Sequence, residues 1–310
     1  MTRIITFLFI YLLNNLVSFA QIKTEDITIK NDSILLPGTL TFNQNNKQPL
    51  LIFVPGSGNP DRNGNQPDFN VNPDYIKQLS NSLTANNLAF FRYDKRNVTK
   101  ENIKHILKQY VFEDLVKDVS SIIENFKEDK RFTEIILIGH SQGSLVAMLA
   151  VNQHIDKYIS LAGLGESADK ALTRQITAQS PILGETAKQH LTELKNTKSI
   201  KEIHPFLSAI FTKQNHEFLV SYIKYNPSEE IQKITIPTLI INGTKDFQVP
   251  VEDAKALHNA NPSSELQIIT NMNHVLKHIE KEDDNMKSYT TPDFSISKEL
   301  ITAIVNFAKQ

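Results

Sequence analysis

The residues best suited to chemistry in this chain form the pentapeptide Gly139-His140-Ser141-Gln142-Gly143. An apolar run at 135–138 precedes it and a small, helix-compatible run at 144–150 follows, so the pattern predicts a strand, a sharp turn and a helix. Gly139 and Gly143 are expected where two backbones approach too closely for side chains. The turn would strain Ser141 and lift its hydroxyl toward the amide N–H groups at the start of the helix.

A nucleophilic serine needs two partners, a base that takes its proton and a carboxylate that holds the base in one tautomer. In such a sheet, they are expected after later strands, in the order Ser, Asp, His. Asp246 follows the apolar run 238–241, and His274 follows the run 266–269. We therefore predict Ser141 as nucleophile, His274 as base and Asp246 as the orienting acid. Weaker candidates lie inside a predicted helix or past a strand end: Asp253 and Glu252 for the acid, His278 and His258 for the base.

The loop after the apolar run 50–54 is rich in glycine and reads Pro55-Gly56-Ser57-Gly58-Asn59. Its glycines permit close backbone approach to a substrate oxygen. We predict an oxyanion hole formed by the backbone N–H groups of Ser57 and Gln142. The alternative for this loop is an ordinary flexible turn.

Composition excludes several other classes of function. The 310-residue chain has a formal net charge of −1 and no dense block of Lys and Arg, which argues against nucleic-acid binding. It has no cysteine, so thiol nucleophiles, disulfides and thiolate metal sites are excluded. His274-x-x-x-His278 resembles a metal spacing, but His274 has a better explanation as the base. The segment from Asp61 resembles a calcium loop, but its glycine is misplaced and Asn72 stands where a glutamate is required. We predict no metal and no cofactor.

Residues 1–20 read as a secretion signal. Arg3 gives a positive start, residues 4–13 are apolar except Thr6, and small residues precede a cleavage point after Ala20. The apolar run is too short to span a bilayer, so we predict export to the periplasm or the medium rather than stable membrane insertion.

Eight strand-like segments alternate with helical patterns over the remainder of the chain. The strands are expected at 27–30, 34–42, 50–54, 88–93, 134–138, 157–161, 238–241 and 266–269, and helices at 73–85, 111–127 and 295–309. This order predicts an α/β fold with a mostly parallel central sheet, helices on both faces and an antiparallel start. Pro37-Gly38 in the second segment predicts a bulge or an edge position. Residues 166–231 lack a strand pattern and are expected to form a helical cap inserted into one domain, 21–310.

These motifs together resemble the α/β-hydrolase fold family. More narrowly, the chain resembles secreted bacterial esterase-like hydrolases related to the serine aminopeptidase and dienelactone hydrolase groups. The resemblance spans nearly the whole mature chain and depends on Val54-Pro55-Gly56-Ser57-Gly58 with Asp61-Arg62, Arg92-Tyr93-Asp94-Lys95-Arg96, the Ser141 pentapeptide, Asn242-Gly243-Thr244-Lys245-Asp246 with Gln248-Val249-Pro250, and Asn273-His274. Relatives usually continue the Asp-Lys-Arg segment with a glycine-rich turn, which Asn97-Val98-Thr99-Lys100 replaces here. We expect Arg92, Asp94 and Arg96 to form structural ion pairs.

The sequence predicts a serine hydrolase that cleaves small-molecule carboxylic esters of small to medium acyl size through an acyl-enzyme. One alternative is an exopeptidase or amidase with the same triad. An aminopeptidase would need an acidic group in the cap, for which the candidates are Glu166, Glu185, Glu193 and Glu202. Another alternative is a binding protein that has lost turnover. The sequence leaves the oligomeric state open.

Overall fold

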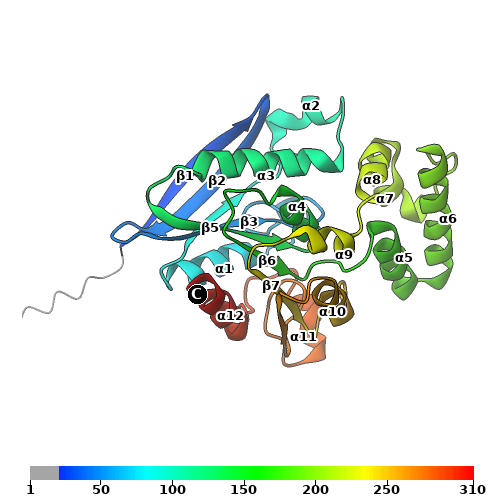
Figure 1. The fold of residues 1–310 in the computed structure, drawn as a ribbon. Coiled ribbons are helices and arrows are strands. Elements are labelled where there is room, and N and C mark those ends of the chain that lie inside the picture. The colour runs from blue at the N-terminus through cyan, green and yellow to red at the C-terminus, as the bar shows by residue number, and fades with distance from the viewer. Residues whose placement is uncertain (1–20) are drawn as a thin grey trace, which may run out of the picture.

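The computed structural model describes residues 21–310, which form an eight-stranded sheet with helices on both faces (Figure 1). The strands lie in the order β1-β2-β4-β3-β5-β6-β7-β8. β1 pairs antiparallel with β2 and β2 with β4, whereas all later neighbours are parallel. The mostly parallel sheet with an antiparallel start is therefore confirmed. The strand bounds are β1 Ile22–Asn31, β2 Ile34–Asn43, β3 Gln48–Val54, β4 Ala89–Tyr93, β5 Phe132–His140, β6 Lys157–Leu161, β7 Thr238–Gly243 and β8 Glu265–Ile269.

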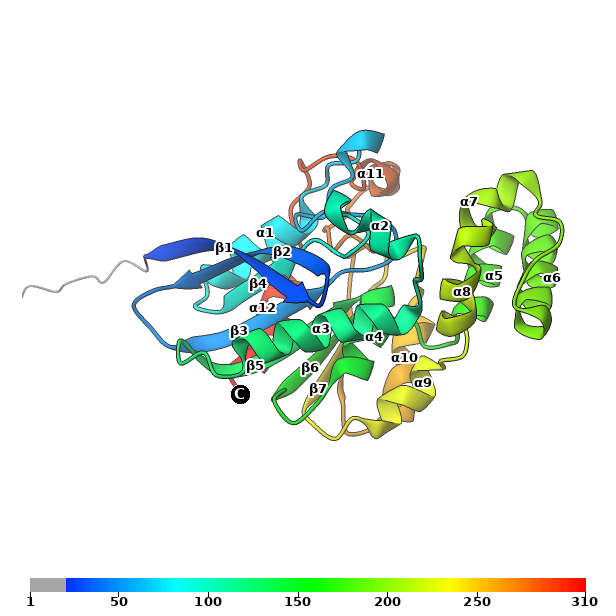
Figure 2. The same ribbon diagram turned by 90° about the horizontal axis from the view of Figure 1, so that it is seen from above.

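Side chains of β3 alternate between two separate cores, one on each face of the sheet. Leu51 and Phe53 belong to one core, and Ile52 and Val54 belong to the other. The strand is apolar from Leu50 to Val54 because both of its faces are buried there. The first core is closed by α1 (Tyr75–Thr84) and α12 (Lys298–Ala308), and the second by α3 (Phe112–Phe126), α4 (Gln142–Ala150) and α10 (Val251–Ala260) (Figure 2).

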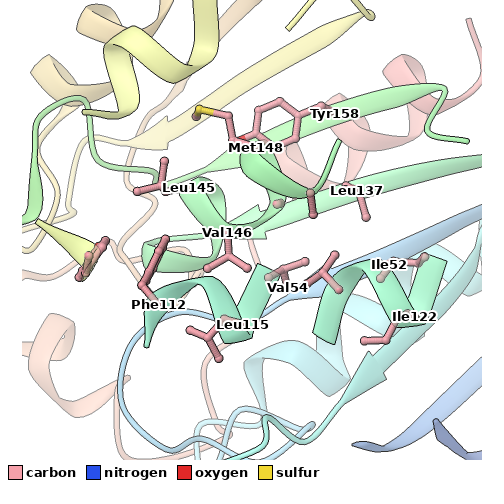
Figure 3. Packing of buried hydrophobic residues seen from close by; sticks show 14 of the residues in the cluster. Ile52, Val54, Phe112, Leu115, Ile122, Leu137, Leu145, Val146, Met148 and Tyr158 are labelled. Carbon is pink, nitrogen blue, oxygen red and sulfur yellow. The ribbon is translucent and has the colours of Figure 1, made fainter. Parts of the chain in front are cut away.

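The second core fixes the position of α4, the helix that follows Ser141. Figure 3 shows Leu145 and Val146 of α4 between the strands and the apolar side of α3. Every residue of α4 except Leu149 is buried, which matches its lack of a polar face. Each fully buried Leu or Val side chain contributes about 1.5–3 kcal/mol. The start of α4, where the serine lies, is therefore held by the core.

The prediction of a bulge or an edge position at Pro37-Gly38 is wrong. β2 lies between β1 and β4, and its register with β1 is continuous through both residues. Pairing with β4 begins only at Gly38, so the missing N–H of Pro37 lies where β4 forms no ladder with this strand. A Cβ on Gly38 would lie 2.3 Å from the ring of Phe91, so the close approach of that ring requires glycine here.

Residues 162–237 contain helices and no strand in the described structure. These helices are α5 (Ala168–Gln179), α6 (Pro181–Thr197), α7 (Ser208–Phe211), α8 (His216–Tyr222) and α9 (Pro227–Glu230). Both views place α5–α8 together at one side of the sheet (Figures 1 and 2). The Tyr222 ring of α8 stacks on Phe112 of α3 with centroids 4.4 Å apart, and the Ser221 hydroxyl accepts a 2.7 Å hydrogen bond from the Phe112 N–H.

Two further short helices, α2 (Ile103–Ile106) and α11 (Glu282–Lys287), lie in loops. In the part of the chain that is described, no helix combines the length and apolarity that crossing a membrane requires. The predicted signal peptide, residues 1–20, lies outside the described residues.

Candidate active site

Ser141 is the single residue between the end of β5 and the start of α4. Its backbone has φ 54° and ψ −123°, a conformation that side chains rarely adopt. A Cβ on Gly139 would lie 2.4 Å from the carbonyl oxygen of Gly143. A Cβ on Gly143 would lie 2.2 Å from the carbonyl oxygen of Val54. Both positions accept only glycine, as expected from the close approach of the two backbones.

Asp246 and His274 lie together, each in the loop after its strand. The His274 Nδ1–H donates a 2.7 Å hydrogen bond to Asp246 Oδ2. The other carboxylate oxygen, Oδ1, accepts 2.9 Å bonds from the backbone N–H groups of Gln248 and Val249. These bonds fix the carboxylate, and the carboxylate fixes the imidazole with its proton on Nδ1. Nε2 is then left as the proton acceptor.

Ser141 and His274 both line a cavity of about 290 Å³, together with Gly56 and Ser57. Within residues 21–310, no hydrogen bond joins the Ser141 and His274 side chains. A bond between nucleophile and base is often long before substrate binds. The geometry therefore places a serine hydroxyl and an oriented imidazole at one cavity.

Ser57 and Gln142, whose backbone N–H groups were predicted as oxyanion donors, line the same cavity as Ser141. Gln142 opens α4, where the first N–H groups have no partner inside the helix. The loop containing Ser57 packs against the turn, since a Cβ on Gly56 would lie 3.0 Å from the Ser141 Cβ. In the described part of the chain, neither N–H donates a hydrogen bond. Both donors are therefore available to a substrate oxygen.

His140, which precedes the serine, was not predicted to have a role. Its Nε2 donates a 2.8 Å hydrogen bond to the backbone carbonyl of His274, and the Tyr75 hydroxyl lies 3.5 Å from Nδ1. Burial lowers the pKa of His140 to about 3, with a smaller effect from His274, so the ring is neutral. His140 thus ties the serine turn to the histidine loop. No local pattern in the sequence could show a contact between residues so far apart in the chain.

A second cavity, of about 570 Å³, extends from Ser141, Ser57 and Gln142 toward the helical segment. Its apolar lining from that segment consists of Leu164, Ala168, Ala171, Leu172, Ala209, Ile210, Phe218, Leu219 and Tyr222. Among the described residues, neither cavity is lined by an aspartate or a glutamate.

The four acidic candidates for an amine site lie away from both cavities. Glu166 forms an ion pair of 2.9 Å with Arg174, and Glu193 accepts a hydrogen bond from the backbone of Lys201. Glu185 and Glu202 are exposed.

The alternative acids and bases have other partners. Asp253 accepts 2.8 Å bonds from Arg174 and from the backbone N–H of Gly165. Glu252 pairs with Lys255, His258 contacts Ser264, and His278 lies 3.9 Å from Glu280. None of the four lines either cavity. Over residues 21–310, no group of three His, Asp or Glu side chains has the arrangement of a metal site.

The helical segment is attached to the loop that contains Asp246. Gln175 of α5 donates a 2.9 Å hydrogen bond to the carbonyl of Gln248, whose own N–H is bonded to Asp246. Arg174 of α5 forms the ion pair with Asp253 of α10. Two contacts therefore join α5 to the segment 246–253.

Two of the three expected structural ion pairs are present. Asp94 binds Arg62 at 2.7 Å, and Arg96 binds Asp118 at 2.7 Å. Arg92 differs, since it donates to the side chains of Asn63 and Thr41 rather than to a carboxylate.

The sequence matches one protein family and two characterised relatives. The family described as "Serine aminopeptidase, S33" matches residues 74–282. Esterase EstD of Thermotoga maritima is 24% identical over 247 residues, which cover 78% of this chain and 57% of EstD. Proline iminopeptidase PfmaB of Pestalotiopsis fici is 24% identical over 211 residues, which cover 57% of this chain and 72% of PfmaB. The chain thus spans little more than half the length of EstD.

Solved structures show the fold. The Pyrococcus furiosus esterase Pf2001 aligns with a TM-score of 0.59 at 15% identity, over 94% of this chain and 91% of that one. Est1E from Butyrivibrio proteoclasticus gives 0.56 at 15% identity, over 92% and 99%. A bromoperoxidase from Bacillus anthracis gives 0.56 at 14% identity, over 92% and 100%. The predicted α/β-hydrolase fold is confirmed, but structures with different printed activities share it, so the reaction must be argued from the site.

Proposed function

We propose, from the premise that this chain belongs to the serine aminopeptidase S33 family of α/β hydrolases, that it is a serine hydrolase of carboxylic esters. The observation that carries the proposal is the 2.7 Å bond from His274 Nδ1 to Asp246 Oδ2, with the imidazole and the Ser141 hydroxyl at one cavity. An imidazole held in this tautomer can take the serine proton through Nε2.

The reaction follows from these positions. His274 Nε2 accepts the Ser141 proton as the serine oxygen attacks the ester carbonyl. The oxygen of the tetrahedral intermediate accepts hydrogen bonds from the N–H groups of Ser57 and Gln142. The C–O bond to the alcohol breaks as His274 returns the proton to the leaving oxygen. Water then attacks the acyl-Ser141 bond by the same proton transfers in reverse, which releases the acid and restores the serine.

The alcohol and acyl parts of the ester are assigned to different cavities. The alcohol must leave next to His274, which protonates it, and His274 lines only the smaller of these two cavities. The acyl group is therefore assigned to the larger cavity, which contains Ser57 and Gln142 but not His274. Its volume of about 570 Å³ and its apolar lining from α5, α7 and α8 favour acyl groups well beyond acetyl. We propose that residues 166–231 act as a cap that covers this acyl site.

The lining favours an ester over a peptide with a free amino terminus. A charged amine in a closed site requires a carboxylate, because an unpaired buried charge is costly. Within residues 21–310, neither cavity offers one. Aminopeptidase activity, which the family description names, is therefore the weaker candidate.

Hydrolysis of p-nitrophenyl butyrate by the purified protein and by Ser141→Ala tests the proposal. We expect activity and fluorophosphonate labelling in the wild type, with loss of both in the variant. Persistence of hydrolysis in the variant would refute the mechanism. Comparison of a naphthyl ester with an aminoacyl-naphthylamide separates the two enzyme classes, since a faster amide would favour the peptidase. A wild type that neither turns over nor labels would favour the binding protein.

We also propose that the protein is exported after cleavage following Ala20, because of the pattern of residues 1–20. Amino-terminal sequencing of the protein recovered from cells is expected to begin at Gln21. A chain that still begins at Met1 would argue against export.

A further inference from the structure

Lys95 follows β4 and is almost fully buried, with 4% of its surface exposed. It lines the larger cavity. Within the described part of the chain it forms no ion pair, and its ammonium group contacts neutral oxygens instead. A buried cation without a carboxylate is destabilising, so stability does not explain a lysine at this position. The proposed reaction, as described above, gives this side chain no part.

The Lys95 Nζ donates two 2.7 Å hydrogen bonds, one to the carbonyl oxygen of Gly56 and one to that of Gly58. These two carbonyls lie on either side of Ser57 in the chain. One buried side chain thus holds the loop that carries the proposed oxyanion donor at two positions, the residue before Ser57 and the residue after it.

Peptide geometry links the first of these bonds to the Ser57 N–H. The Gly56 carbonyl and the Ser57 N–H belong to the same peptide unit, which is planar and trans, so the two groups point in opposite directions. Fixing the Gly56 oxygen therefore fixes the direction of the Ser57 N–H. The same bond polarises the peptide, which makes the N–H a stronger donor. The contact of Gly56 with Ser141 then sets the position of this peptide relative to the nucleophile.

We propose that Lys95 is a positioning residue for catalysis, which orients the Ser57 N–H toward the oxyanion by holding the Gly56 and Gly58 carbonyls. The inference depends on the proposed function. Burial lowers the pKa of Lys95 to about 7. Both the ammonium and the neutral amine have at least two N–H donors, so the two bonds persist on either side of neutral pH.

The test compares kcat and KM for p-nitrophenyl butyrate in wild type, Lys95→Met and the matched control Lys100→Met, an exposed lysine of the same segment. Loss of one oxyanion donor lowers kcat by about 100-fold to 1,000-fold. For Lys95→Met we expect kcat to fall about 100-fold with KM within threefold. The control is expected to match the wild type.

A second readout separates positioning from packing. A boronic acid that forms a tetrahedral adduct with Ser141 mimics the intermediate, so its affinity is expected to fall by the same factor as kcat/KM. A packing defect would instead lower the thermal midpoint of unfolding, or raise KM, while kcat stays unchanged. Either of these results would overturn the inference. If Lys95→Met does not fold, Lys95→Gln decides by the same criterion, with an intermediate kcat expected because its amide retains two N–H donors. An inactive wild type would overturn the proposed function and this inference together, whereas an active wild type with an unaffected Lys95 variant overturns the inference alone.

Discussion

Replacing Ser141 by glycine is expected to stabilise the protein while it abolishes activity. Ser141 has φ 54° and ψ −123°, and such a conformation costs a residue with a side chain about 1–3 kcal/mol. Glycine has no such cost, but the greater conformational freedom of glycine in the unfolded chain lowers the free energy of unfolding by about 0.5–1 kcal/mol. The net gain relative to Ser141→Ala is about 1 kcal/mol, or about 2 °C in Tm for a chain of this length.

The comparison with Ser141→Ala isolates the strain. Both variants lack the hydroxyl, and they differ only in the Cβ that the backbone conformation disfavours. Thermal and urea unfolding of the two proteins provide the measurement. Ser208, which has ordinary helical angles of φ −60° and ψ −34°, supplies the control, since glycine there is expected to be less stable than alanine. If Ser141→Gly proves no more stable than Ser141→Ala, the nucleophile is not strained and the reasoning fails.

Three further changes test the rest of the site. Asp246→Asn removes the carboxylate acceptor that sets the His274 tautomer, so kcat is expected to fall about 10,000-fold. The circular dichroism spectrum is expected to stay unchanged. A fall in kcat of less than tenfold would contradict the role assigned to Asp246. Ala209 is exposed and lines the larger cavity, so Ala209→Trp is expected to fill part of that cavity. We expect kcat/KM to fall at least tenfold more for p-nitrophenyl octanoate than for p-nitrophenyl acetate. Equal effects on the two substrates would place the acyl group elsewhere. Burial lowers the pKa of Lys277 to about 8 from 10.5, so between these values the unfolded chain holds a proton that the folded chain lacks, and stability rises with pH. Urea unfolding at pH 7 and 9.5 is expected to show the wild type gaining stability relative to Lys277→Met at the higher pH, and the opposite trend would refute the sign.

The strands with two buried faces were predictable, and the polar edge of the sheet was not. β6 has the predicted bounds, Lys157–Leu161, and all five of its residues are buried. β1 begins at Ile22, five residues before the predicted start. Its first residues include Lys23, Glu25 and Asp26, which are typical of an exposed edge strand and carry no apolar pattern.

The site was predictable where the chemistry depends on residue type and strand order. The loops after β7 and β8 brought Asp246 and His274 within 2.7 Å, although their roles stay a prediction. The supporting contacts could not be predicted in the same way. His140 meets the His274 carbonyl across 134 residues of sequence, and Lys95 meets Gly56 across 39. Such contacts depend on where loops end in space, which a single sequence does not encode in any local pattern.

The contacts of α5 with segment 246–253 limit how substrate can enter. If α5 swung outward as a lid, it would break the Gln175 bond to Gln248 and the ion pair of Arg174 with Asp253. The Gln248 carbonyl belongs to the same peptide unit as the Val249 N–H, which donates to Asp246. An outward movement of α5 would therefore also disturb the position of the Asp246 carboxylate as the substrate binds. We therefore expect α5 to stay in place through turnover.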